Sequence, residues 1–160
     1  MLWLVVILVV YYVRGDYLKL STKGRYGLKA MLDLAFHYND SPISLKVIAE
    51  RQHLSENYLE QLIAILRRAG LVNSVRGAQG GYMLSKPPEK IKVGEIIQAL
   101  EGTLAPVDCV RENGNLKCEK FDQCVSRIVW IKIRESTSKL LNSMSLADIC
   151  CEVNRTKKGG

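Results

Sequence analysis

Two short amphipathic segments follow one another at residues 45–53 and 56–69, and they constrain the fold most. Each segment carries apolar residues at helical spacing, and Ser44 and Ser55 stand where helix N-caps are expected. Gly70 ends the second segment as a C-terminal stop. Only a tight connection lies between the segments. Two short helices joined in this way predict a helix-turn-helix.

A glycine-rich hairpin is expected directly after this pair. Strand-like runs at residues 71–72 and 82–84 flank the sequence RGAQGG at 76–81. Such a basic, flexible tip is typical of a wing whose arginine reaches a minor groove. A nucleotide-phosphate loop is excluded, because no G-x-x-x-x-G-K-S/T motif is present. With a helix expected over residues 22–38, the pattern predicts a mainly α fold with a small β-hairpin wing, a winged helix-turn-helix over residues 18–100.

The second helix and the wing tip hold the residues that we expect to contact DNA. They are Ser55, Asn57, Tyr58, Glu60, Gln61, Arg76, Gly77 and Ala78. Residues 18–100 carry 12 Lys and Arg against 7 Asp and Glu, whereas residues 101–160 carry 10 against 8. This excess indicates a polyanionic partner, namely double-stranded DNA. Alternatively, the polar residues only form the first turn of a surface helix, and the positive charge only aids solubility.

Three of the five cysteines, Cys109, Cys118 and Cys124, lie in one polar loop over residues 101–125. Thiols in a hydrophilic stretch are better explained as ligands of zinc or of an iron–sulfur cluster than as core residues. An odd number of unevenly spaced cysteines does not fit a secreted disulfide framework. We therefore expect a reducing, cytoplasmic setting.

A helix expected over residues 126–144 is longer than the core of so small a domain requires. It could pack against a twofold-related copy, which would match a palindromic DNA site, or it could cap the winged domain. The short helix that follows contains Cys150 and Cys151, of which at least one is expected in the core. We assign residues 126–153 to dimerisation and expect residues 154–160 to form a disordered tail.

The first 17 residues form an apolar extension in which residues 2–13 read LWLVVILVVYYV. This run is too short to cross a bilayer, which needs about 20 residues. It also lacks the basic region and the cleavage site of a signal peptide, so no membrane partner is expected. Either a genuine N-terminal element or a native translation start near Leu18 explains it.

Several motifs, in this order, resemble the iron–sulfur cluster regulator (IscR) family, whose relatives include NsrR and CymR. They are residues 20–26 (LSTKGRY), 58–61 (YLEQ), 75–77 (VRG), 80–82 (GGY) and the three-cysteine loop. The resemblance covers about residues 18–152. It implies a bacterial homodimeric transcription factor, a repressor of iron–sulfur biogenesis genes, with a 2Fe–2S cluster on Cys109, Cys118 and Cys124. It also implies that the helix after Ser55 reads the major groove and that Arg76 reads the minor groove.

One position departs from the family pattern. The IscR pattern places a ligand histidine three residues after the last cysteine, where this chain has Arg127. The acidic ligand of NsrR-like proteins would fall at Arg25. Arginine stays protonated and offers no lone pair to a metal. The fourth ligand therefore stays open among Asp108, Glu119, Asp122, a partner residue, a small thiol and water.

No catalytic constellation accompanies these motifs. The two histidines, His37 and His53, form no Ser/His/Asp or Cys/His pattern, and no cofactor fingerprint is present. We therefore expect neither an enzyme nor a small-molecule substrate. Three regulators stay open: a sensor of cluster status, a nitric-oxide, iron or redox sensor of the same superfamily, and a zinc-stabilised DNA-binding module without sensing.

Overall fold

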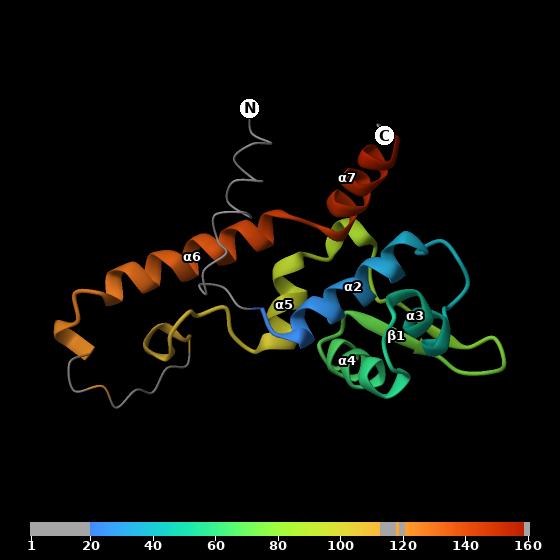
Figure 1. Ribbon diagram of the computed structural model, residues 1–160, viewed down its shortest axis with the longest axis horizontal. Coiled ribbons are helices and arrows are strands. Elements are labelled where there is room, and N and C mark those ends of the chain that lie inside the picture. The colour runs from blue at the N-terminus through green and yellow to red at the C-terminus, as the bar shows by residue number, and fades with distance from the viewer. Residues whose placement is uncertain (1–19, 113–117, 119–120, 159–160) are drawn as a thin grey trace.

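The computed structural model describes residues 20–112, 118 and 121–158. The helices, in chain order, are α2 (Thr22–Phe36), α3 (Leu45–Gln52), α4 (Glu56–Arg68), α5 (Val93–Glu101), α6 (Arg127–Ser143) and α7 (Leu146–Lys158). The strands β1 (Val72–Val75) and β2 (Gly81–Leu84) lie between α4 and α5, and short 3-10 turns are η1 (Pro88–Lys90), η2 (Asp108–Val110) and η3 (Phe121–Gln123). The extension predicted over residues 1–17 lies outside the described residues. The predicted mainly α fold with a hairpin is confirmed (Figure 1).

The two helices of the predicted helix-turn-helix begin where the sequence places them. The hydroxyl oxygen of Ser44 accepts a hydrogen bond from the backbone N–H of Val47 at 3.4 Å, and that of Ser55 accepts one from Tyr58 at 3.3 Å. His53 ends α3 in the left-handed conformation, with φ of 53°, and so reverses the chain between the helices. Local capping therefore defines this motif.

The core lies where α2, α4 and α5 meet, with α3, the hairpin and the start of α7 closing it. Its largest fully buried side chains are Met31, Leu34, Ile48, Leu59, Leu62, Ile63, Leu66, Ile91, Ile96, Ile97, Leu100 and Leu146. α2 and α5 pack closely, because a Cβ at Gly27 would overlap the side chain of Leu100. α4 buries one face in this core, and residues on its other face, such as Asn57 and Gln61, are exposed.

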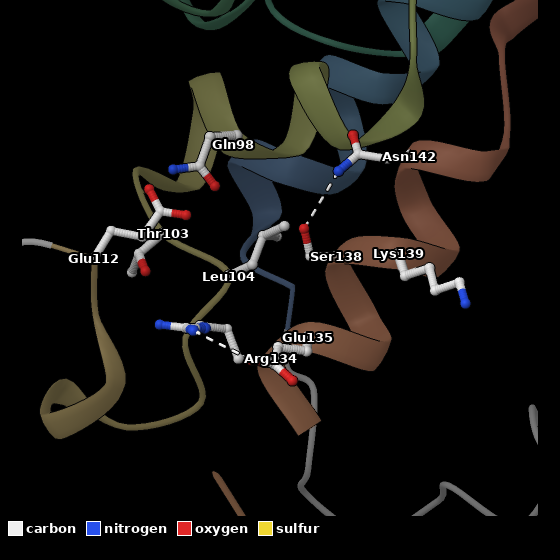
Figure 2. A pocket seen from close by; sticks show the side chains of 9 residues that line it. All are labelled: Gln98, Thr103, Leu104, Glu112, Arg134, Glu135, Ser138, Lys139 and Asn142. Carbon is white, nitrogen blue, oxygen red and sulfur yellow. Dashed lines mark hydrogen bonds and ion pairs between the residues drawn. The ribbon is translucent and has the colours of Figure 1, made fainter. Parts of the chain in front are cut away.

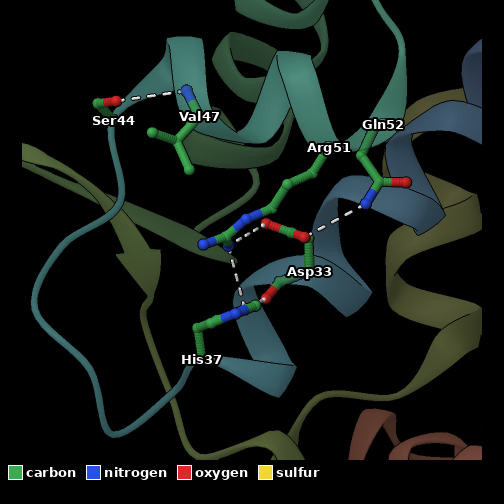
Figure 3. Close-up of polar contacts among 6 residues, drawn as sticks. All are labelled: Asp33, His37, Ser44, Val47, Arg51 and Gln52. Carbon is green, nitrogen blue, oxygen red and sulfur yellow. Dashed lines mark hydrogen bonds and ion pairs between the residues drawn. The ribbon is translucent and has the colours of Figure 1, made fainter.

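A buried carboxylate joins α2 to α3 (Figure 3). Asp33 is 6% exposed, and its two carboxylate oxygens accept hydrogen bonds from Arg51 and Gln52, each at 3.3 Å. The Nδ1 atom of His37 lies 2.8 Å from the backbone carbonyl oxygen of Asp33. A buried charge is tolerated only when it is paired and hydrogen-bonded. These contacts therefore fix the angle between α2 and the helix-turn-helix.

The predicted wing is confirmed as an antiparallel hairpin of β1 and β2, with Val72 opposite Leu84 and Val75 opposite Gly81. A segment before α3 extends it, because Ile43 and Tyr82 exchange backbone hydrogen bonds at 3.0 and 2.8 Å. The wing is therefore attached to the helix-turn-helix at its base.

α6 agrees with the long helix expected over residues 126–144, and none of its residues is buried. It extends away from the winged domain (Figure 1) and contacts chiefly α5 and η2. Arg134 joins α6 to η2 by donating a hydrogen bond to the carbonyl oxygen of Val110 at 2.6 Å. No helix in the part of the chain that the structure describes is long and apolar enough to span a bilayer.

The disordered tail predicted from Asn154 is wrong as far as Lys158, because α7 continues to that residue. Ser145 and Asp148 cap the start of α7: the backbone N–H of Ser145 donates to the Asp148 carboxylate at 2.8 Å, and the N–H of Asp148 donates to the Ser145 hydroxyl at 3.1 Å. The sequence has no Gly or Pro between Leu146 and Lys158. Polar residues such as Arg and Lys propagate helices well, so polarity alone does not end one.

Candidate nucleic-acid interface and cysteine loop

The first two turns of α4 present polar side chains to solvent. Asn57, Glu60 and Gln61 are exposed, and no hydrogen bond or ion pair with another described residue engages their side chains. Ser55 differs, because its hydroxyl oxygen already caps the helix, although its hydrogen remains a donor. The inner face of α4, with Leu59 and its buried neighbours, anchors the helix in the core. The exposed groups are therefore displayed on a rigid element.

Tyr58 is half-buried and packs edge-to-face on Tyr26 of α2, with the ring centroids 6.3 Å apart and an interplanar angle of 89°. The ammonium group of Lys29 lies 5.3 Å from the centroid of the Tyr26 ring. The contacts among Lys29, Tyr26 and Tyr58 support the first turn of α4 and place the ammonium group of Lys29 near it. Neither Tyr26 nor Lys29 was predicted from the sequence to contribute to the DNA-binding surface. The available signal was their i, i+3 spacing on one helix.

The wing tip is exposed at Arg76, Gly77 and Ala78. Gly77 has φ of 116°, which favours glycine, and its carbonyl oxygen accepts a hydrogen bond from Gly80 at 2.9 Å. No described residue pairs with the guanidinium of Arg76. The tip therefore combines a tight turn with a free cation, which is the arrangement that a minor-groove contact needs.

The structure places the three loop cysteines in different environments. Cys109 in η2 and Cys124 after η3 are half-buried, whereas Cys118 is exposed. The Sγ atom of Cys124 lies 3.2 Å from the Ser126 hydroxyl. That hydrogen bond, followed by a backbone hydrogen bond from Arg127, lowers the pKa of the Cys124 thiol. Cys124 is therefore disposed toward the thiolate form that binds metals.

Within the described residues, no three His, Cys, Asp or Glu side chains are grouped as a metal site. The structure thus does not bring Cys109, Cys118 and Cys124 together, and their role as ligands stays a prediction. Cys150 packs against the core, as expected for one of the pair in α7, and burial raises the pKa of its thiol. Cys151 is exposed.

Arg127, the first residue of α6, occupies the position of the expected histidine ligand and packs against the cysteine loop. Its guanidinium carbon lies 4.0 Å from the centroid of the Phe121 ring, and its Nε atom is buried without a hydrogen-bond partner among the described residues. Of the candidate fourth ligands, Asp108 forms an ion pair with Arg111 at 2.8 Å, Asp122 is exposed, and residue 119 lies outside the described part. Arg127 therefore places a cation beside Cys124.

This winged helix-turn-helix with an exposed reading helix defines a DNA-binding transcription regulator, and comparison with known proteins agrees. A family model described as "Rrf2: Iron-dependent Transcriptional regulator" matches residues 20–152. The chain belongs to the Rrf2 family, a family of transcriptional regulators and not of enzymes.

Individual relatives carry two different regulator names. IscR of Yersinia enterocolitica is 43% identical over 132 residues, which cover 82% of this chain and 79% of the relative. The solved structure of T. potens IscR is 51% identical with a TM-score of 0.69, covering 85% of this chain and 88% of that one. The structure of CymR, the global cysteine regulator of B. subtilis, is 46% identical with a TM-score of 0.70, covering 84% and 98%. These identities do not separate the IscR type from the CymR type.

Proposed function

We propose that this chain is a homodimeric bacterial repressor that binds a palindromic operator and senses cluster status through a 2Fe–2S cluster on Cys109, Cys118 and Cys124. It acts in the cytoplasm on iron–sulfur biogenesis genes. The observation that carries the sensing role is the loop between η2 and α6, in which soft thiol ligands and a low thiol pKa at Cys124 accompany a DNA-binding domain. The loop joins α5 of the winged domain to α6, so metal binding there would change how these two elements are placed.

For DNA, the proposal assigns the major groove to the exposed face of α4 and the minor groove to the wing tip. Gln61 and Asn57 carry amide groups that suit base edges, and the N-terminus of α4 favours phosphate. Arg76 supplies the cation for the minor groove. Tyr58 is held against Tyr26, so it would form a fixed part of the surface that meets DNA rather than a side chain that moves to contact a base.

For the dimer, support comes from apolar side chains that α6 and the residues before it leave exposed. Val125, Ile128, Val129 and Leu140 are 83%, 60%, 52% and 61% exposed. Within α6, Val129 and Leu140 are eleven residues apart and so lie on one face of the helix, a placement that suits packing against another helix. A second copy of α6 would bury this stripe, and the resulting twofold axis would match a palindromic operator.

For the cluster, the donor set fits the chemistry. Three thiols suit iron or zinc, and a thiol with a lowered pKa is deprotonated more readily for binding. A cluster on three thiolates would carry net negative charge, and Arg127 would offer a compensating cation beside Cys124. When bound, the cluster would supply a redox-sensitive, degradable signal. Cys109, Cys118 and Cys124 would hold it, and Ser126 would keep Cys124 in its low-pKa state.

A second candidate, a zinc-stabilised module without sensing, uses the same three thiols. Anaerobic purification followed by visible spectroscopy and analysis for iron, sulfide and zinc separates the two. The proposal expects a brown protein with iron and acid-labile sulfide in equal amounts. A colourless protein with one zinc per chain would favour the second candidate. A protein with neither metal would favour a third function, a thiol-based redox sensor of the same family. The lowered pKa of the Cys124 thiol supports this alternative.

A further inference from the structure

A polar pocket lies outside the DNA-binding surface, where α5, the segment after it and α6 meet (Figure 2). Its volume is about 320 Å³, and Gln98, Thr103, Glu112, Arg134 and Ser138 are among its lining residues. Small-molecule sites begin at about 300 Å³, so the pocket has room for one small ligand. Figure 2 shows the side-chain ends of Gln98 and Glu112 near each other and Arg134 on the other side of Leu104, whereas Lys139 points away from them.

The pocket contains charges of both signs that do not neutralise each other. The carboxylate of Glu112 has no hydrogen bond or ion pair with another described residue. Arg134 has its side chain 28% exposed and uses one N–H on the carbonyl oxygen of Val110 at 2.6 Å. Its contact with the mostly exposed carboxylate of Glu135 is long, at 3.9 Å, so it adds little. Arg134 therefore keeps N–H donors for a ligand.

The uncharged polar side chains that line the pocket also offer both hydrogen-bond acceptors and donors. The side-chain N–H of Gln98 donates to the carbonyl oxygen of Gly102 at 3.0 Å, which leaves the Gln98 oxygen as an acceptor. The hydroxyl of Ser138 accepts from Asn142 at 3.2 Å, which leaves its hydrogen as a donor. Acceptors therefore come from Gln98 and Glu112, and donors come from Ser138 and Arg134 on one face of α6.

We propose that this pocket binds a small zwitterion with the size and charge of a free α-amino acid. The ligand's ammonium group binds Glu112 and the side-chain oxygen of Gln98. Its carboxylate binds Arg134 and Ser138, since a guanidinium is well matched to a carboxylate. A ligand with a single charge leaves one wall of the pocket unpaired and binds more weakly.

The ligand would bridge three parts of the molecule. Gln98 belongs to α5 in the winged domain, Glu112 to the segment that follows Cys109, and Arg134 to α6. Because Arg134 also binds Val110, which adjoins Cys109, occupancy of the pocket would restrict how the winged domain is placed relative to α6. An amino acid that favours one placement would change operator affinity, and the operator would change amino-acid affinity by the same factor.

The test uses the full-length metal-free chain at fixed salt and pH. Isothermal titration is performed with each of the standard L-amino acids, and then with the methyl ester and the N-acetyl derivative of any that binds. The proposal expects saturable binding of at least one free amino acid and at least about tenfold weaker binding of both derivatives, which each lack one charge. It is overturned if no free amino acid binds with a Kd below about 10 mM, or if either derivative binds as tightly as its parent.

Two matched variant pairs locate the site. Glu112→Gln and Ser138→Ala should weaken binding, by about tenfold or more for Glu112→Gln. Glu50→Gln on α3 and Ser136→Ala on α6 change the same residue types outside this pocket and should bind as wild type does. Unchanged thermal unfolding without ligand shows that the variants fold. Wild-type affinity in Glu112→Gln, or equal losses in both members of a pair, would overturn the proposal.

Discussion

The carboxylate of Glu101, the last residue of α5, accepts hydrogen bonds from both the backbone N–H and the hydroxyl of Ser21, at 3.0 and 2.7 Å. Ser21 in turn caps α2 by accepting from the N–H of Gly24 at 3.3 Å. A Cβ at Gly24 would overlap this carboxylate. The start of the DNA-binding domain is thus tied to the residue from which the chain leaves for the cysteine loop.

Replacing Glu101 with Ala should lower the free energy of unfolding by about 1–3 kcal/mol, because two charge-assisted hydrogen bonds at a helix N-terminus are lost. Urea denaturation of the metal-free protein measures this difference. Glu89→Ala, at an exposed position in η1, is the control and should change stability by less than about 0.5 kcal/mol. Equal effects of the two substitutions would show that the Glu101 contacts are not stabilising.

Arg76→Ala and Gln61→Ala should each weaken binding to the specific operator by about 1–3 kcal/mol, the range for a base-directed contact. Fluorescence anisotropy at fixed salt, on operator and random duplexes, measures the loss. Arg155→Ala on α7 removes an exposed cation away from the proposed interface and should leave both affinities unchanged. If Gln61→Ala reduced binding equally on both duplexes, Gln61 would not read sequence.

In the metal-free protein, Cys124 should be alkylated by iodoacetamide at lower pH than an unperturbed thiol, because the Ser126 hydroxyl lowers its pKa. The substitution Ser126→Ala should shift the pH dependence of the Cys124 alkylation rate to higher pH. Cys150 should react slowly, because burial raises its pKa. Mass spectrometry of each labelled peptide across pH gives the rates. An unchanged pH profile for Cys124 in Ser126→Ala would show that the Ser126 hydroxyl does not lower the pKa of Cys124.

Asp148 should contribute to stability in a pH-dependent way. Hydrogen bonds from the Ser145 side chain and backbone lower the pKa of Asp148 below its ordinary value of 3.8. A carboxyl group with a depressed pKa stabilises the fold above the ordinary value, and this contribution is lost as pH falls through the folded value. The stability difference between wild type and Asp148→Asn should therefore be constant above the ordinary pKa and shrink in acid. A difference that does not vary with pH would contradict the capping role.

Local signals in the sequence predicted the helix-turn-helix, because Ser44 and Ser55 cap helices through residues only three positions away. Contacts between distant segments could not be predicted in this way. Asp33 meets Arg51 across 18 positions, and Glu101 meets Ser21 across 80. Neither pairing leaves a periodic pattern in the sequence, since each depends on how two helices pack.

The same distinction between local sequence signals and long-range contacts applies to the candidate site. Residue type and spacing marked Gln61 and Arg76 as polar groups on a reading helix and a wing, and the structure places both in solvent. The capping box at Ser145 and the absence of a helix breaker extend α7 through the region where polarity predicted disorder. Composition indicates solvent exposure, whereas helix length depends on caps and breakers.

The central claim is that metal occupancy of the cysteine loop controls DNA binding. Operator affinity is measured anaerobically, at fixed salt, for the metal-loaded protein, the metal-free protein and the variant with Cys109, Cys118 and Cys124 all changed to Ala. The account predicts that the metal-loaded protein differs in affinity or in site preference by about 5–150-fold, the usual range of such coupling. The metal-free protein and the triple variant should behave alike. If all three forms bind every site with the same affinity, the loop does not sense, and the account is contradicted.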